Sequence, residues 1–326
     1  MRHALRRLGF FTVTLWACVT LNFVLPRLMP GSPILDMMAK YRGKVSPQAI
    51  KAIEVAFGVD THASLVSQYV SYLGDMATGN FGMSLTQTEP VSTVIAGAVW
   101  WTVGLIGVTT IIGFVLGTLI GIVGAWRRGG WLDGILPPVF VITSSIPFFW
   151  LGMVLILLVA KLDPTFPASG AYAYGATPGL NWPFVADVLQ HALLPALAIL
   201  ITSIGGWILT MRNTMVTVLA EDYVRMARAK GLPGWRIMFD YAARNAMLPN
   251  LSGFAMSLGF VLSGAILVEY LFSYQGVGYY LLQAVVNQDY ALMQALFLLI
   301  TVAVLVAILA ADILTAFLDP RTRTAG

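Results

Sequence analysis

Residues 100–126 have the sequence WWTVGLIGVTTIIGFVLGTLIGIVGAW, in which no side chain is charged. A helix that crosses the hydrocarbon core of a membrane needs about 20 consecutive apolar residues, so this stretch is long enough to span it. Its apolar character is continuous, whereas the strands of an outer-membrane barrel alternate apolar and polar residues. The stretch therefore predicts a transmembrane helix and argues against a barrel.

Similar runs recur along the chain, which is 58% hydrophobic and only 10% charged, with a mean hydropathy of +0.80. Soluble domains carry about 25% charged residues, so a soluble fold is excluded. In lipid each backbone must hydrogen-bond within its own segment, so each run predicts one helix. We expect an all-α membrane protein with six transmembrane helices, at Leu8–Pro26, Val91–Trp126, Gly134–Ala160, Val188–Met211, Asn245–Val268 and Tyr290–Ala311.

The basic residues predict the orientation. With the N-terminus in the cytoplasm, the inside segments hold more than twice as many Lys and Arg as the outside segments, as the positive-inside rule requires. The first run follows Arg2, Arg6 and Arg7 but precedes no small-residue cleavage pattern, so it is interpreted as a retained helix. We expect both termini in the cytoplasm and an extracytoplasmic segment over residues 30–95, with helix-like pieces at Pro47–Phe57 and Ser64–Met76.

Several functional classes lack their signals in this chain. The six runs contain no Asp, Glu, Lys or Arg, although ion-coupled carriers usually need such groups inside the membrane. The sole Gly-Lys pair, Gly43–Lys44, does not fit a phosphate-binding loop. Cys18 stands alone, and the three His residues are too scattered to suggest a metal site. We expect no catalytic residue, no cofactor and no metal in this chain, and an ion-coupled carrier or channel is the disfavoured alternative.

The loop between the fourth and fifth runs, residues 212–245, is strongly basic and carries its own helix signals. Glu221–Lys230 predicts a short helix with acidic residues in its first turn and basic residues in its last. Gly231 follows as a left-handed stop, and Pro233 starts a second helix. That helix is predicted to bury one apolar face, consisting of Trp235, Met238, Phe239, Ala242, Ala243 and Ala246, opposite Arg236, Asp240 and Arg244. Such a loop is either an amphipathic element on lipid headgroups or a docking element for a cytoplasmic partner.

The segment Tyr223-Val-Arg-Met-Ala-Arg-Ala-Lys-Gly-Leu232, followed by Ala243-Arg-Asn-Ala-Met-Leu-Pro249, resembles the signature loop of permease subunits of ATP-binding-cassette importers. The branch it is most similar to handles dipeptides and oligopeptides and includes nickel and some oligosaccharide importers. Further stretches resemble the same branch in the same order: Arg27–Pro33, Gly79–Ser84 with Pro90-Val, His191–Pro195, Val268–Gly278, Asn287–Tyr290 and Leu318–Arg321.

The resemblance implies a type I importer permease in a prokaryotic inner membrane. The chain would have four parts. Residues 1–29 would hold the cytoplasmic N-terminus and the first helix, residues 30–95 the extracytoplasmic segment, residues 96–318 a five-helix core, and residues 319–326 a cytoplasmic tail. The expected partners are a homologous second permease, two ATPase subunits that bind ATP and Mg²⁺, an extracytoplasmic substrate-binding protein and the lipid bilayer, with no nucleic acid. The chain would form the pathway for peptides; oligosaccharides or nickel are the alternative substrates.

The resemblance also implies which residues touch the ATPase: Glu221, Tyr223, Arg225, Ala227, Arg228, Lys230, Gly231 and Leu232. The chain departs from the general importer pattern, which begins Glu-Ala-Ala where this loop has Arg225, Met226 and Ala227. Any role of that Glu therefore does not transfer.

Small residues in the predicted spans leave alternatives open. Gly113, Gly117 and Gly121 would allow close helix packing, within the chain or at a subunit interface. Ser252, Ser257 and Ser263 would line a substrate pathway or bond to their own helix backbone. Pro137, Pro138 and Pro147, with Ser144 and Ser145, are expected to kink the third span.

Overall fold

The structure is a computed structural model that describes residues 2–29, 64–263 and 266–318. Within these residues all regular secondary structure is helical, apart from one isolated antiparallel bridge between Met83 and Pro90. The predicted all-α fold class is confirmed. The predicted helix Pro47–Phe57 and the tail 319–326 lie outside the described residues, as do residues 30–63 of the predicted extracytoplasmic segment.

Four helical stretches in the described part of the chain are long and apolar enough to cross a membrane: Gly9–Leu28, Val91–Trp126, Trp182–Val218 and Tyr290–Ala310. Two bent helix pairs bring the number to six if each pair makes one crossing: Pro137–Ser145 with Phe148–Leu162, and Gly234–Gly259 with Val261–Leu271. All six stretches overlap the apolar runs seen in the sequence.

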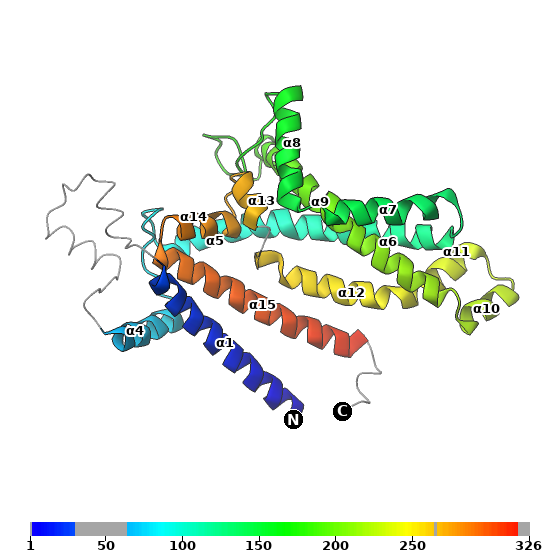
Figure 1. Cartoon of the computed structure of the whole chain (residues 1–326), viewed down its shortest axis with the longest axis horizontal. Helices are drawn as coiled ribbons and strands as arrows, with labels where there is room; N and C mark the ends of the chain where they lie inside the picture. Colours follow the sequence, from blue (N-terminus) through cyan, green and yellow to red (C-terminus); the bar gives the residue numbers. More distant parts are fainter. Residues whose placement is uncertain (1, 30–63, 264–265, 319–326) are drawn as a thin grey trace. The chain divides into compact units, whose positions relative to one another are not determined.

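The chain divides into two compact units. Unit 1 comprises residues 1–102, 262–266 and 275–305. Its main helices are α1 (Arg2–Leu28), α4 (Leu65–Thr78), α5 (Val91–Thr102), α14 (Val277–Val286) and the first part of α15 (Tyr290–Leu318). Helices α5 and α14 lie side by side and share an apolar core with the start of α15 (Figure 1). The predicted helix Ser64–Met76 is present as α4, with the Ser64 side chain capping its first turn.

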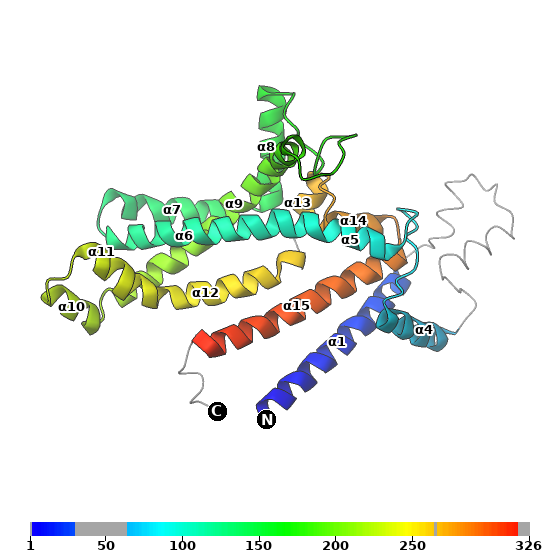
Figure 2. The same cartoon turned by 180° about the vertical axis from the view of Figure 1, so that it is seen from behind.

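Unit 2 comprises residues 103–261, 267–274 and 306–326. It is built on α9 (Trp182–Val218), against which α6 (Val108–Trp126), α7 (Trp131–Ser145), α8 (Phe148–Leu162) and α12 (Arg244–Gly259) pack (Figures 1 and 2). A π-helix, η1 (Val103–Gly107), precedes α6, and the short elements η3 (Val261–Ser263) and α13 (Ile266–Leu271) follow α12. Helix α9 is longer at both ends than the predicted run, since Asn181 caps its start and Arg212–Val218 remains helical.

The three glycines of α6 explain its close approach to α9. A Cβ atom added at Gly117 would lie 2.5 Å from Trp207 Cβ, and one at Gly121 would lie 2.7 Å from the Ile208 carbonyl oxygen. A Cβ at Gly113 would lie 3.4 Å from Leu200. These positions have neighbours within this chain, as the intrachain-packing alternative requires. The α6 backbone packs against α9 where a side chain would not fit.

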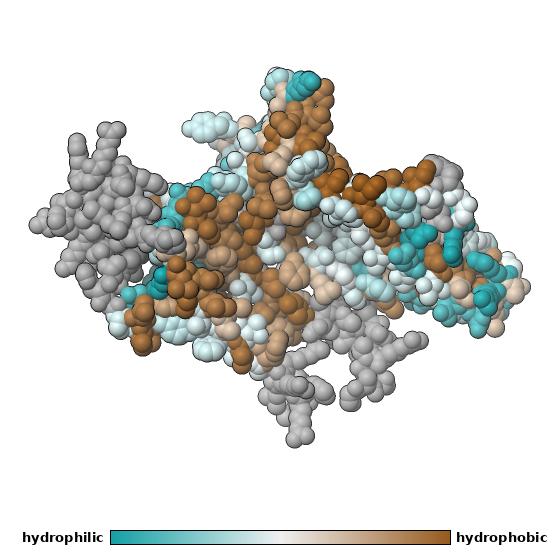
Figure 3. All heavy atoms as spheres, viewed as in Figure 1, coloured by the Kyte–Doolittle hydropathy of each residue, from teal (hydrophilic) through white to brown (hydrophobic). Residues whose placement is uncertain are grey.

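The predicted third span is broken. Helix α7 ends at Ser145, α8 begins at Phe148, and their axes differ by 90°. Pro147 has no backbone N–H to continue the helix, and the Ser145 hydroxyl bonds back to the Val141 carbonyl. The expected kink is therefore confirmed, and it is a complete break between two helices. Large apolar side chains such as Leu157 and Leu162 remain exposed on α8, whose surface is brown in Figure 3.

Candidate functional site: the basic loop and its attachment

The basic loop (residues 212–245) begins within α9 and contains the predicted short helix as α10 (Asp222–Ala229). Glu221 is the N-cap residue, Asp222 lies in the first turn and Arg228 in the last. Gly231 has φ +73°, the left-handed conformation expected of a residue after a helix end. Gly231 N donates to the Arg228 carbonyl and Leu232 N to the Ala227 carbonyl, which together form a Schellman stop. The local sequence predictions are confirmed here.

One face of α10 attaches the helix to the rest of unit 2. Val224 and Ala227 are buried together with Ile237, and Trp126, Val218, Leu219 and Leu232 pack around them. Burial of this kind is the main source of stability for a short helix. Two predicted docking residues, Ala227 and Leu232, therefore serve at least this attachment.

The other face of α10 is exposed, and it carries most of the predicted docking residues. Exposed residues here are Glu221, Asp222, Tyr223, Arg225, Met226, Arg228, Lys230 and Gly231. Arg225 pairs with Asp222 at 3.4 Å, and the Arg228 guanidinium lies 5.9 Å from the Trp126 ring centre. Met226, 60% exposed one turn after Tyr223, was not among the predicted residues. Hydrophilic residues gather over this end of unit 2 in Figure 3. The face offers charges around an apolar centre, a composition suited to a protein partner.

The second helix of the loop differs from the prediction. After α11 (Gly234–Arg236), a π-helix, η2 (Ile237–Ala243), leads into α12. Its wider turns bury Ile237, Ala242 and Ala243 and leave Phe239 exposed, and Trp235, in α11 before it, is exposed as well. The predicted apolar face was therefore wrong for Trp235 and Phe239, because it assumed α-helical spacing throughout. The predicted pair of Arg236 and Asp240 is present at 3.6 Å.

Small residues at the junction of η2 and α12 pack against α6 and α9. Ala242, Ala243 and Ala246 are buried against residues of α6 and α9, namely Ile122, Ala125, Met211 and Met215. Small side chains let three helices approach closely. The basic loop is thus packed onto the helices that lead away from it.

The three candidate pathway serines lie in or just after α12. Ser252 donates its hydroxyl to the Leu248 carbonyl at 3.1 Å, which is the backbone-bonding alternative. Ser257 is partly exposed on α12, and Ser263 falls in η3.

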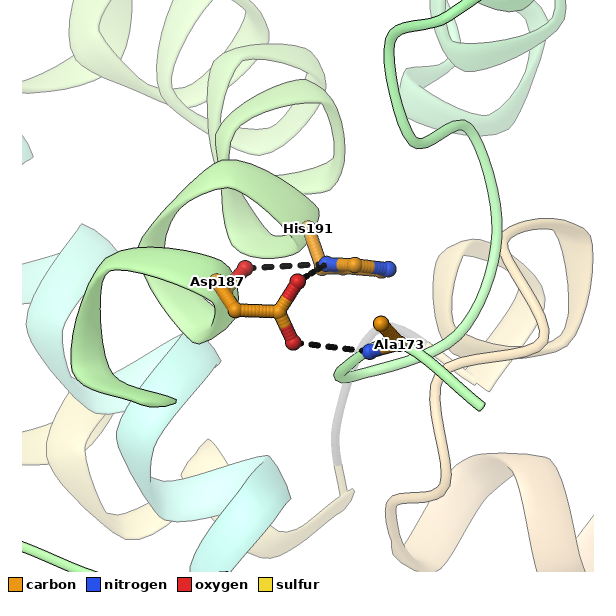
Figure 4. Close-up of polar contacts among 3 residues, drawn as sticks. All are labelled: Ala173, Asp187 and His191. Atoms are coloured by element: carbon orange, nitrogen blue, oxygen red, sulfur yellow. Dashed lines mark hydrogen bonds and ion pairs between the residues drawn. The ribbon is translucent and has the colours of Figure 1, made fainter. Parts of the chain in front are cut away.

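A polar cluster that sequence reasoning missed ties down the glycine-rich loop (residues 163–181) of unit 2. Asp187, on α9, accepts a hydrogen bond from Ala173 N at 2.7 Å, and its other carboxylate oxygen lies 3.3 Å from His191 Nδ1 (Figure 4). His191 Nδ1 also lies 2.9 Å from the Asp187 carbonyl. Since both neighbours are acceptors, Nδ1 carries the proton. The sequence signal was the His191–Pro195 motif, whose partner Asp187 lies one turn earlier on α9 and bonds to the loop through Ala173.

Unit 1 contains a second missed cluster. The Asp289 carboxylate is fully buried and accepts hydrogen bonds from Ser84 Oγ, Thr86 N and Thr86 Oγ1 at 2.6, 2.9 and 2.9 Å. It also caps the start of α15 through Leu292 N. Two sequence motifs, Gly79–Ser84 and Asn287–Tyr290, thus meet at one carboxylate.

Glu269 was placed outside the fifth run by the sequence, but it lies fully buried in α13. Nearby, burial and, to a smaller extent, the charge of Glu269 together raise the pKa of Tyr274 to about 12. Among the described residues, no group of three His, Cys, Asp or Glu side chains comes together as a metal site would need.

A family model described as the binding-protein-dependent transport system inner membrane component matches residues 113–324, which include the whole basic loop. The chain belongs to this family. The resemblance inferred from the motifs is thereby confirmed, and with it the type I importer permease fold.

Curated relatives match almost the full chain. A di/tripeptide transport system permease protein of Pseudomonas aeruginosa (strain UCBPP-PA14) is 34% identical, over 98% of this chain and 97% of its own length. A dipeptide transport system permease protein of Lactococcus lactis is 32% identical, over 99% of both chains. An oligopeptide transport system permease protein of Bacillus subtilis (strain 168) is 30% identical, over 98% of both.

Proposed function

We propose that this chain is the permease subunit of an ATP-driven importer that takes up dipeptides or oligopeptides. It would work with a second, homologous permease, two ATPase subunits and an extracytoplasmic binding protein, in a bacterial inner membrane. The peptide relatives support the substrate class. The observation that carries the mechanism is α10, a helix packed on one side and exposed with charges on the other.

The proposed mechanism uses that geometry. The ATPases close on ATP and move α10, and the packed alanines of η2 and α12 pass the movement to α6 and α9. The spans then change the side on which the pathway opens, and the peptide enters from the binding protein. Within this chain the residues position and move; hydrolysis belongs to the ATPase subunits.

The substrate test uses the whole importer in liposomes. With the binding protein present, we expect ATP-dependent uptake of a labelled di- or tripeptide. Competition by an oligosaccharide or by Ni²⁺, without competition by peptides, would replace the peptide assignment with one of the alternative substrates. The chain purified without partners should hydrolyse no ATP, and hydrolysis by it would remove the subunit assignment.

Orientation is tested with two exposed positions in a background where Cys18 is replaced by Ser. A cysteine at Thr177, in the glycine-rich loop, should react with an impermeant thiol reagent added outside intact cells. A cysteine at Arg228 should react only after the cells are opened. The opposite labelling would overturn cytoplasmic termini and a cytoplasmic basic loop.

A further inference from the structure

Asn250 lies one residue after Pro249 in α12 and is 1% exposed. Its amide nitrogen donates to Thr118 Oγ1 of α6 at 3.1 Å and reaches the Trp207 carbonyl of α9 at 3.4 Å. One side chain therefore bonds α12 to both neighbouring helices of unit 2. Buried amide groups of this kind fix the register of packed helices.

Aromatic rings join the same three helices one turn further along α12. Phe114 of α6 stacks on Phe254 of α12 with ring centres 4.2 Å apart, and the Trp207 ring packs edge-on against both. Gly253 also faces the Trp207 ring, and a Cβ added there would be in ordinary contact with it at 3.4 Å. On the other side of Asn250, the alanine core of η2 and α12 completes the contact. The joint is thus continuous from the basic loop to Phe254.

Asn250 is the polar element in this otherwise apolar joint, and it is incompletely satisfied. Its Oδ1 atom is buried without a hydrogen-bond partner. An unpaired buried acceptor destabilises a fold, and replacing both partners of a buried hydrogen bond by apolar groups of the same shape can be nearly neutral or stabilising. A joint that served stability alone would be served as well by apolar side chains at both Asn250 and Thr118. The amide is therefore best explained by a directional task, the alignment of α12 on α6 and α9.

We propose that Asn250 is a positioning residue for transport: its bonds to Thr118 and Trp207 carry the movement of the basic loop from α12 to α6 and α9. The proposal rests on the proposed function. Without the amide the three helices would still pack, but α12 could slip or rotate against its neighbours. Loss of Asn250 should therefore uncouple ATP hydrolysis from transport without unfolding the chain.

The experiment compares variants of the whole importer, reconstituted in liposomes with its binding protein. The readouts are thermal stability, basal ATP hydrolysis, and peptide imported per ATP hydrolysed. For Asn250→Leu, which removes a partner of the Thr118 hydroxyl, we expect a lower thermal stability but an assembled importer, and a peptide-to-ATP ratio reduced at least about five-fold, the lower end of couplings between sites. Thr118→Val should give the same loss, and Thr118→Ser, which keeps the hydroxyl, should retain the wild-type ratio.

Asn22 of unit 1 provides a matched control. It is also buried, its amide also bonds across helices, to Tyr72 Oη and the Gln294 carbonyl, and its Oδ1 is also unpaired. Asn22→Leu should keep the wild-type ratio, because Asn22 bonds to Tyr72 and Gln294 of unit 1 and not to the helices named in the proposal.

The outcomes separate the two proposals. A wild-type importer that moves no peptide would overturn the proposed function. If the wild type transports and Asn250→Leu keeps its peptide-to-ATP ratio, the positioning role is wrong. An equal loss in Asn22→Leu would likewise overturn it, since buried amides would then matter only as structure. If Asn250→Leu fails to assemble, the test rests on Thr118→Val. A wild-type ratio of imported peptide to hydrolysed ATP in Thr118→Val would overturn the proposal.

Discussion

The basic loop and the glycine-rich loop of unit 2 are attached to α9 by opposite means. The basic loop is held by Val, Ile, Met and Ala side chains, while its ion pairs, Asp222–Arg225 and Arg236–Asp240, lie exposed in water. Exposed pairs of this kind contribute little. The glycine-rich loop is held to α9 by the Asp187 carboxylate, which accepts a hydrogen bond from Ala173 N, and by the contact of the Tyr172 ring with Phe184. Within the loop, Asp163 accepts a hydrogen bond from Thr165 N.

The difference indicates what each loop can do. A loop attached by close packing moves with its helices, as a force-transmitting element must, and is sensitive to changes in side-chain volume. A loop attached by a few hydrogen bonds can open locally and is sensitive to charge. Four changes, from the largest expected effect to the smallest, test this contrast.

The largest effect is expected from Gly121→Leu. Its Cβ would meet the Ile208 carbonyl and Met211 Cβ at 2.7 and 2.8 Å, so α6 must move away from α9. We expect destabilisation of about 3 kcal/mol, the upper end for overpacking. Thermal unfolding of the chain alone in detergent measures it, with Gly206→Leu as control because its Cβ would face open space. Unchanged stability in Gly121→Leu would favour the subunit-interface role of this glycine.

Gly231→Val should abolish ATPase stimulation by the liganded binding protein while leaving the spans intact. An added Cβ at Gly231 meets nothing within 4 Å in this chain, but the left-handed backbone costs a side chain about 1 kcal/mol or more. Gly231→Asn separates the two causes, since Asn tolerates this conformation. If Gly231→Ala loses ATPase stimulation and Gly231→Asn keeps it, Gly231 acts as a simple helix stop. If both variants lose stimulation equally, a partner lies close to Gly231. Full ATPase stimulation in Gly231→Val would contradict a role of Gly231 in coupling.

Asp187→Asn should loosen the glycine-rich loop without affecting the basic loop. The Asp187 side chain is 24% exposed, so loss of its charged contacts to Ala173 N and His191 is expected to cost about 1 kcal/mol. A loss of about 1 kcal/mol corresponds to an about five-fold larger opening equilibrium, so hydrogen exchange at the Ala173 amide should become about five-fold faster. Asp222→Asn, an exposed change in the basic loop, serves as control. Unchanged exchange at Ala173 would show that packing, not the carboxylate, holds this loop.

The smallest effect concerns Asp163, whose pKa is lowered by the hydrogen bonds from the Thr165 hydroxyl and backbone N–H. A lowered pKa means that this contact stabilises the loop above the ordinary pKa of aspartate and is lost as the pH falls through the lowered value. Thr165→Val removes the hydroxyl and should raise the pKa of Asp163 toward the ordinary value. Carbon-13 NMR titration of labelled aspartate measures it, and an unchanged pKa in the variant would contradict the assignment.

The sequence was sufficient where the signal is local. Helix α10, its stop at Gly231 and the break at Pro147 follow from a few neighbouring residues. The π-helix η2 could not be predicted, because its spacing depends on how α6 and α9 receive Ala242 and Ala243. Contacts between distant residues were also beyond the sequence: Thr118 and Asn250 are 132 positions apart, and neither residue type indicates the other.

The π-helix η2 has a consequence for how the loop tolerates changes in length. Each π turn holds one residue more than an α turn, so Ile237–Ala243 contains a surplus residue that packing has already absorbed. Deletion of one residue there would restore an α-helix and leave α10 and α12 facing as they do now. The same deletion inside α12 would turn every later side chain by about 100°. Loss of the one surplus residue in η2 is therefore expected to leave the direction of α10 unchanged.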